Sequence, residues 1–186
     1  MRLLALWTEG FRRRLVEKAW EGYIHCMSEA ATTPLAQALG RVSSGLYVVT
    51  TMGPSGPLGF VGSFVSQVGF KPPTLSLAIE EGRDHLVAIR EQGHFGLSIL
   101  DQDSSKLMGA FFKKYEEGTS PFDSLEMLET ECGVPVLAGA LGWLTCKLTS
   151  EHTPCEHVVV FGEVTAGAML REGDPLSHVR KDGLKY

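Results

Sequence analysis

The sequence predicts a mainly β protein, an antiparallel barrel with short helices between some of its strands. Runs of β-branched and aromatic residues alternate with glycine- and proline-rich turns, and the helical segments among them are brief. Glycine accounts for 21 of the 186 residues. This exceeds the usual share of ~7% and suits many tight turns and close backbone approaches. Because no repeat or linker marks a second domain, we expect one domain over residues 34–186, preceded by an extension over residues 1–33.

The expected strands share a run of apolar, β-branched or aromatic residues with a glycine or proline near one end. The turn at residues 53–57 holds two glycines and two prolines, and it predicts a hairpin between the first two strands. The pair Pro72-Pro73 ends the second strand, because proline offers no amide hydrogen to a sheet. In chain order, the predicted strands are residues 46–51, 58–68, 74–79, 95–100, 141–149 and 158–165.

Three short helices are predicted between these strands. Thr33 can cap the first, which runs over about residues 35–42. Asp84 can cap the second, and Gly93 would end it. The third follows the polar residues 103–105 and carries several apolar side chains.

The first residues of the chain form a pattern of their own. Apolar residues recur at four-residue steps from Leu3 to Leu15, beside three consecutive arginines, and predict an amphipathic helix. This helix could pack against the protein or a second copy, or it could bind a membrane surface. Alternatively, Met27 is the natural start and residues 1–26 are not native.

Composition excludes several classes of function. The net charge of −5 gives no basis for nucleic-acid binding. The four cysteines form no C-x-x-C pair, so a reducing cytoplasm is the expected setting. No apolar run approaches the ~18 residues of a membrane span, and we expect no membrane partner. Without a G-x-G-x-x-G, Walker A or G-x-S-x-G motif, any dinucleotide would bind without a dinucleotide fold.

The strand predicted at residues 58–68 becomes small and polar in its middle. Gly62 removes side-chain bulk, so a ligand could approach the backbone there. Ser63, Ser66 and Gln67 add short hydrogen-bonding groups beside that opening. Apolar walls with a few polar groups suit a planar heterocyclic ligand, although a strand kinked by glycine at a barrel corner would look the same.

From about Leu35 to Tyr186, the chain resembles the flavin reductase-like family, the FMN-binding split barrels. It is most similar to flavoredoxin-like proteins and to the flavin reductase domain of diflavin flavoproteins. The family's flavin-binding strand typically runs Gly-x-Thr-x-Asn-x-x-Thr/Ser-x-x-x-x-Pro-Pro, and here Ser63 replaces the Asn and Ser66 the Thr. The resemblance implies an antiparallel split β-barrel and a homodimer with FMN at or near the subunit interface. The flavin contacts that it implies in this strand are Gly62, Ser63, Phe64, Ser66 and Gln67.

The resemblance places the flavin phosphate near the turn after the third strand, with Arg83 and His85 as implied ligands. A helix start there would supply amide donors and a favourable field. Asp84 stands where serine is common, and we expect it to cap the helix and point away from the phosphate. Lys113 matches a family lysine that approaches the phosphate. Arg83 could equally be a solvated charge, and Lys113 could simply complement the helix dipole.

Two further segments carry candidates through the resemblance. His157 matches a family histidine near the flavin and the nicotinamide pocket. It is the one catalytic candidate, to orient a carboxamide or stabilise an anionic flavin, unless it is a turn histidine bonded to backbone. The closing segment contains every letter of the family's His-x-Arg-Lys-x-Gly-x-x-Tyr, which implies contacts at the flavin edge from His178, Arg180 and Tyr186. A frayed, basic C-terminus would also account for it.

A metal site is the competing interpretation of the turn around His157. His152 and Cys155 lie in the same turn, and Cys146 lies in the strand before it. The spacing is not a standard zinc pattern, and we predict no metal.

The predicted function is therefore an FMN-binding, NAD(P)H-dependent flavin reductase that passes a hydride from nicotinamide to flavin. FAD and riboflavin are alternative flavins, NAD(P)H is a transient substrate, and a flavin-using or redox protein partner would receive the electrons. Two alternatives remain open. One is an electron-transfer flavoprotein reduced by a protein partner, and the other is a non-catalytic split barrel that binds another ligand. The sequence does not distinguish NADH from NADPH.

Overall fold

The computed structural model describes residues 33–113, 115–116 and 118–184. The chain divides into a barrel unit over residues 44–178 and a second unit, which contains residues 33–43 and 179–184 among the described residues. The predicted extension lies outside the described residues apart from Thr33, as does the alternative start at Met27. The boundary at residues 33 and 34 stays a prediction.

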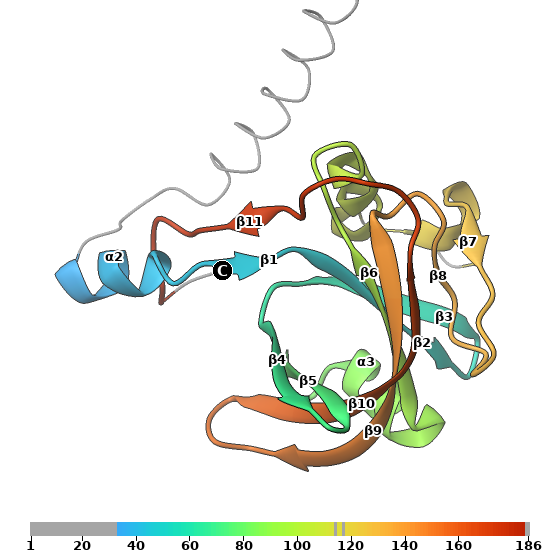
Figure 1. Ribbon diagram of the computed structural model, residues 1–186, viewed down its shortest axis with the longest axis horizontal. Coiled ribbons are helices and arrows are strands. Elements are labelled where there is room, and N and C mark those ends of the chain that lie inside the picture. Colours follow the sequence, from blue (N-terminus) through green and yellow to red (C-terminus); the bar gives the residue numbers. More distant parts are fainter. Residues whose placement is uncertain (1–32, 114, 117, 185–186) are drawn as a thin grey trace, which may run out of the picture. The chain divides into compact units, whose positions relative to one another are not determined.

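The barrel unit is built on one antiparallel sheet of seven strands, in the order β3-β2-β6-β9-β10-β5-β4 (Figure 1). Each of the six predicted strand regions forms strand, which confirms the mainly β, antiparallel prediction. The seven strands are β2 (Tyr47–Gly53), β3 (Gly56–Gly62), β4 (Val65–Phe70), β5 (Pro73–Glu80), β6 (His94–Ile99), β9 (Gly142–His152) and β10 (His157–Met169).

The sheet must close on itself, because its two outer strands follow each other in the chain. Strands β3 and β4 stand at opposite ends of the sheet order, and only Ser63 and Phe64 separate them. Two residues can bridge at most about 11 Å from Gly62 to Val65. The edges are therefore brought together, yet among the described residues they do not pair with each other. This arrangement is a split barrel, as predicted.

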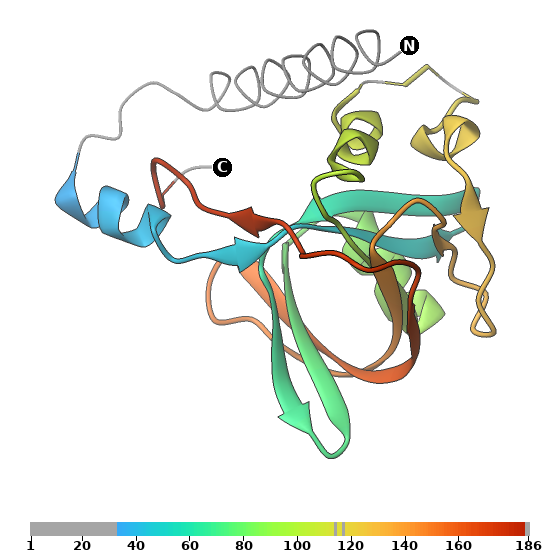
Figure 2. The ribbon, with the colours of Figure 1, turned by 45° about the horizontal axis from the view of Figure 1, so that its top comes forward.

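The single strand predicted over residues 58–68 is wrong, because the chain changes its pairing partner in the middle. Gly62 in β3 lies opposite Tyr47 in β2. Val65 in β4 instead lies opposite Leu77 in β5. A strand cannot stay straight while it moves from one end of the sheet to the other. Figure 2 shows the resulting β4–β5 hairpin, in green, projecting from the rest of the barrel unit.

Apolar side chains that alternate along the strands fill the barrel. Burial of each such side chain contributes roughly 1.5–3 kcal/mol. One approach is especially close, since a Cβ atom on Gly162 would lie 2.6 Å from the Phe95 ring and 2.8 Å from the Cys146 Cβ atom. Glycine is therefore the residue that fits between β10 and the core. The buried cluster contains Val49, Val65, Leu75, Leu77, Ile79, Leu86, Ile89, Phe95, Leu97, Cys146, Val158 and Val160.

Helix α3 (Asp84–Gln92) connects β5 to β6. Gly93 ends it in the left-handed conformation with φ of 72°, as predicted. The predicted capping role of Asp84 is wrong. Arg83 occupies the N-cap position without a side-chain capping bond in the described structure, and Asp84 is the first helical residue.

The remaining elements of the barrel unit are short. Two 3₁₀ helices follow β6. Among the described residues, no helix is long and apolar enough to cross a membrane. The elements are η1 (Ser105–Phe112), η2 (Pro121–Ser124), β7 (Met127–Leu128), which pairs with β8 (Val136–Leu137), and β1 (Ser44–Gly45), which pairs with β11 (Ser177–His178).

The second unit consists of helix α2 (Pro34–Gly40) and the chain's closing residues. The Thr33 hydroxyl accepts a hydrogen bond from the amide of Ala36 at 3.1 Å, which confirms the predicted cap. The tail lies along this helix through two backbone bonds, Arg180 N–H to Gly40 O at 2.8 Å and Gly183 N–H to Ala36 O at 2.7 Å.

An ion pair between a half-buried arginine and a buried aspartate joins the chain just after β6 to the chain after β10. Arg171 donates from Nε and Nη2 to the two carboxylate oxygens of Asp101, at 2.9 and 2.6 Å. Its Nη1 group donates to the carbonyls of Gly139 and Ala140. Burial alone would raise the pKa of Asp101, but bonds from Arg171 and Ser104 outweigh it and lower the pKa to about 2.

Replacing Arg171 with methionine should lower the free energy of unfolding by about 2–4 kcal/mol, because it leaves the Asp101 carboxylate buried without its cation. Since the folded pKa of Asp101 is depressed, its stabilising contribution is present above the ordinary carboxylate pKa and is lost as pH falls towards about 2. Denaturant unfolding at several pH values measures both effects. As a control, Arg90→Met removes the exposed pair with Glu151 and should cost under about 1 kcal/mol. Equal losses in the two variants would contradict the assignment.

Candidate functional site

The two-residue link between β3 and β4 brings together candidates that are far apart in the sequence. Ser63 is buried, whereas Phe64 is 37% exposed, and the Phe64 carbonyl accepts a bond from the amide of Ala78 at 3.0 Å. The Phe64 ring meets the imidazole of His157 edge to face, with ring centroids 5.8 Å apart and planes at 77°. The predicted flavin-binding segment and the predicted catalytic histidine therefore share one edge of the barrel.

His157 is held by groups on two sides. It is the first residue of β10, opposite Glu80 in β5. Its Nδ1 atom lies 3.2 Å from a carboxylate oxygen of Glu156. Because the carboxylate accepts, Nδ1 carries a proton, and Nε2 is the atom left for other contacts. The amide of Glu81 donates to the Glu156 carbonyl at 3.0 Å, which ties this turn to the end of β5.

Ser66 and Gln67 are both exposed on the edge strand β4. The Gln67 side-chain amide donates to the Gly69 carbonyl at 3.2 Å. The Ser66 carbonyl accepts a hydrogen bond from the Ser76 hydroxyl at 3.3 Å. The Ser66 side chain itself is part of the exposed surface. Phe64 in the link before β4, with Ser66 and Gln67 on β4, supplies an aromatic ring, a hydroxyl and an amide within four residues of the chain.

The candidate phosphate ligands at the start of α3 point in different directions. Arg83 donates from Nε to Glu80 at 2.8 Å, in an exposed ion pair. His85 Nε2 lies 3.2 Å from the Gly59 carbonyl, and its ring packs against Phe60 at 4.9 Å between centroids. Burial lowers the pKa of His85, so the ring is neutral near pH 7 and Nε2 carries the proton. In that form Nδ1 accepts, and His85 would need a second proton to donate to a phosphate.

The other candidates are not brought to this edge by any described contact. Lys113 is exposed immediately after η1. His178 is buried in β11, opposite Ser44. Arg180 belongs to the second unit, where its amide binds α2, and Tyr186 lies outside the described residues. The roles inferred for these four residues stay predictions.

The four residues considered as metal ligands do not form one group. Cys146 lies in the core, where burial raises the pKa of its thiol to about 12. Among the described residues, the donor atoms of Cys155, Glu156 and His157 lie within 4.8 Å of one another. This group therefore contains Glu156 and lacks His152 and Cys146, which the sequence had offered as possible metal ligands.

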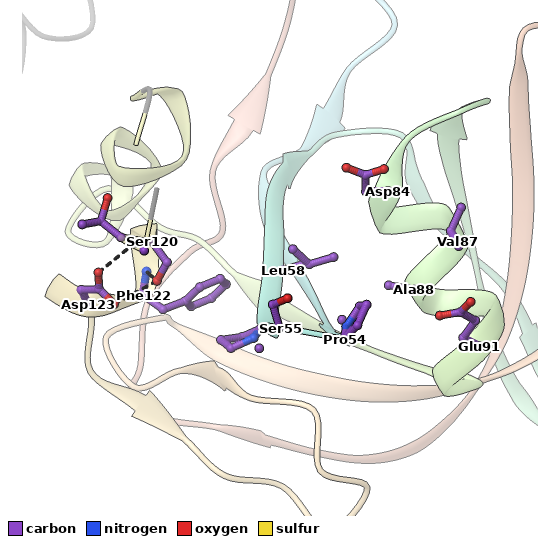
Figure 3. Close-up of a pocket in the computed structure, with 15 residues that line it drawn as sticks. Pro54, Ser55, Leu58, Asp84, Val87, Ala88, Glu91, Ser120, Phe122 and Asp123 are labelled. Carbon is purple, nitrogen blue, oxygen red and sulfur yellow. Dashed lines mark hydrogen bonds between the residues drawn. The ribbon is translucent and has the colours of Figure 1, made fainter. Parts of the chain in front are cut away.

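A cavity of about 760 Å³, which the sequence did not predict, lies on the barrel unit (Figure 3). The β2–β3 turn, the outer face of α3 and the segment from Gly118 to Asp123 form its walls. That segment lies in the long connection between β6 and β9, and the length of this connection is a sequence signal that could have indicated a site wall. Three carboxylates and several apolar side chains face the space.

The sequence matches the family described as "Flavin reductase like domain" over residues 39–183, most of the chain. The chain belongs to this family. Membership confirms the resemblance found in the sequence and the predicted class of protein, an oxidoreductase of the flavin reductase type.

Among relatives of this flavin reductase-like chain, Diflavin flavoprotein A 1 of Synechocystis sp. is 31% identical over 154 residues, which cover 82% of this chain and 27% of that protein. FMN reductase (NADH) SmoA of Agrobacterium fabrum is 31% identical over 139 residues, which cover 75% of this chain and 77% of that protein. The chain thus spans only about a quarter of the diflavin relative.

The solved structure of the styrene monooxygenase flavin reductase SMOB from Pseudomonas putida matches with a TM-score of 0.68 and 24% identity. The match covers 79% of this chain and 93% of that one. This likeness concerns the fold, and it agrees with the barrel described above.

The His85 imidazole should titrate below 6.5, the ordinary pKa of histidine, because burial opposes its charged form. A lowered folded pKa means that neutral His85 stabilises the fold above pH ~6.5 and that this contribution is lost as pH falls through that lowered pKa. NMR of the ring carbons measures the midpoint. If a phosphate binds beside His85, FMN should raise the midpoint and riboflavin should not. A midpoint at or above 6.5 without flavin would contradict the placement of the ring.

Proposed function

We propose that this chain is an NAD(P)H-dependent flavin reductase that binds FMN along β4 and passes electrons to a flavin-using or redox protein partner. The contact between Phe64 and His157 carries the proposal, because it joins the flavin-binding segment to the histidine expected at the nicotinamide pocket. A relative of similar length is named an FMN reductase that uses NADH, which supports the same reaction.

The residues along β4 fit a planar flavin by their chemistry. Phe64 offers an aromatic face in the link before β4, and the polar side chains of Ser66 and Gln67 are exposed on β4. Apolar surface with a few directed polar groups is the usual composition of a cofactor site. When bound, FMN would supply the hydride chemistry, which no side chain of the protein can perform.

The protein's own contribution would be orientation and electrostatics. With Glu156 accepting the proton on Nδ1 of His157, Nε2 would meet a ligand as an acceptor when the ring is neutral and as a donor when it is charged. A donor at that atom would stabilise negative charge that develops on a neighbouring ring. The edge-to-face contact with Phe64 would favour this orientation of the imidazole.

We also propose that the protein works as a homodimer with the flavin near the interface. The exposed apolar residues of β4 support this, since Val68 is 54% and Phe70 is 83% exposed. Apolar side chains gathered on one projecting hairpin are typical of an interaction surface. Sedimentation equilibrium with and without FMN would test it, and a monomer under both conditions would oppose it.

Anaerobic NADH or NADPH should bleach the absorbance of the FMN-loaded protein at about 450 nm, where oxidised flavin absorbs. Stopped-flow spectrophotometry with each nucleotide measures the rates. A flavin band that persists with both nucleotides would replace this proposal with the electron-transfer flavoprotein. Failure to bind FMN or riboflavin would leave a shared fold without the shared function.

If Ser66 and Lys113 hold the phosphate end of the flavin, Ser66→Ala and Lys113→Ala should each weaken FMN about 10- to 150-fold and leave riboflavin nearly unchanged. Loss of a charge-assisted phosphate contact costs roughly 1.5–3 kcal/mol, and riboflavin has no phosphate. Quenching of flavin fluorescence measures both dissociation constants. Lys106→Ala is the matched control, because it removes the same charge from η1 at another exposed position. Equal weakening of both flavins would sink the phosphate assignment.

A further inference from the structure

The turn that joins β9 to β10 (Figure 1) carries three different metal-binding groups. They are the thiol of Cys155, the carboxylate of Glu156 and the imidazole of His157, and one donor atom of each lies within 4.8 Å of the other two. Within residues 33–113, 115–116 and 118–184, no other three side chains of the metal-binding types come together in this way.

The distances within this group are close to those of a tetrahedral zinc site. Around zinc, an oxygen and a nitrogen ligand stand about 3.3 Å apart, and a sulfur and a nitrogen ligand about 3.6 Å apart. Here the carboxylate oxygen of Glu156 and Nδ1 of His157 are 3.2 Å apart. The Cys155 side chain is turned towards the same residue, since its sulfur lies 4.0 Å from the His157 carbonyl oxygen. Because Cys155 is exposed, its thiol is free of the packing that would oppose a small adjustment.

The neighbouring strand holds the backbone beneath two of these ligands. His157 begins β10 and lies opposite Glu80 in β5. The amide of Glu81 donates to the carbonyl of Glu156 at 3.0 Å. The His157 side chain is only 24% exposed, and its ring contacts Phe64 edge to face. A backbone that is fixed before an ion arrives lowers the entropic cost of binding it.

The chemistry of the three groups selects the kind of ion. A thiolate and a carboxylate carry two negative charges, which balance a divalent cation. Sulfur and nitrogen ligands favour zinc and related transition metals, whereas magnesium and calcium prefer oxygen. No metal is predicted from the sequence, because the spacing of histidines and cysteines matches no zinc pattern. Glu156 is the ligand that this spacing leaves out.

We propose that the β9–β10 turn binds a divalent cation of the zinc type and that the ion regulates flavin reduction through His157. Without the ion, Nδ1 of His157 carries a proton that Glu156 accepts. An ion on Nδ1 replaces that proton, so the neutral ring carries its proton on Nε2. Nε2 then becomes a donor, which would stabilise negative charge on a neighbouring flavin. The regulation rests on the proposed function, whereas the binding of the ion does not.

Isothermal titration of the metal-free full chain with zinc chloride tests the site, with magnesium chloride as the comparison. Zinc should bind and magnesium should not, and Cys155→Ser should weaken zinc about tenfold or more by removing the thiolate. Cys132→Ser and His152→Ala are the matched controls, because they remove a thiol and an imidazole outside the group and should leave the affinity unchanged. Zinc affinity that Cys155→Ser leaves unchanged would place the ion elsewhere and overturn the site.

Nitrogen NMR of the His157 ring tests the link to chemistry. Zinc should move the ring proton from Nδ1 to Nε2, and a proton that stays on Nδ1 overturns the proposed ligation. Zinc should also speed flavin reduction by NADH about tenfold or more in wild type and His152→Ala. Cys155→Ser should keep the metal-free rate and lose the response.

The outcomes separate this inference from the proposed function. Zinc that binds and moves the proton but leaves the rate unchanged overturns the regulation and supports the site. If neither nucleotide reduces the flavin, the reductase proposal fails, and the titration and the NMR spectra still decide whether the turn binds zinc.

Discussion

The barrel depends on the two residues that join its first and last edge strands. Ser63 and Phe64 hold β3 and β4 within about 11 Å of each other, although the two strands stand at opposite ends of the sheet order. This covalent link keeps the two edge strands close together, as hydrogen bonds between the edge strands do in a closed barrel. Among the described residues, β3 and β4 do not pair with each other across this split.

Two connections relate this split to the chemistry proposed for the chain. The His157 ring reaches Phe64 because β10 pairs with β5, and β5 pairs with β4. On the other side, the His85 ring binds the Gly59 carbonyl, which fixes the start of α3 against β3. The cavity beside α3 is thus attached to the same strand that enters the split. A shift of either histidine would change the edge of the barrel at which the proposed function places the flavin.

Most of the fold could be predicted, because local signals and the pattern of burial agree. Thr33 caps its helix and Gly93 ends the next, as their backbone preferences dictate. The break at residues 63 and 64 could not be predicted, since it arises from a change of pairing partner and not from local propensity. Asp84 was expected to cap a helix, but Arg83 holds that position and the carboxylate lines a cavity instead. The cavity itself unites three segments that no sequence pattern links.

The two edges at the split differ in how they can pair with other chains. Strand β3 carries Pro57, which has no amide hydrogen, so it interrupts any strand that docks along that edge. Strand β4 holds no proline and no charged residue, and Val68 and Phe70 are exposed on it. An uncovered β4 is therefore a template for strand addition, and aggregation of concentrated protein would begin there and not along β3. Replacing a β4 residue with lysine would improve solubility, because a charged side chain on an edge strand discourages pairing with another chain.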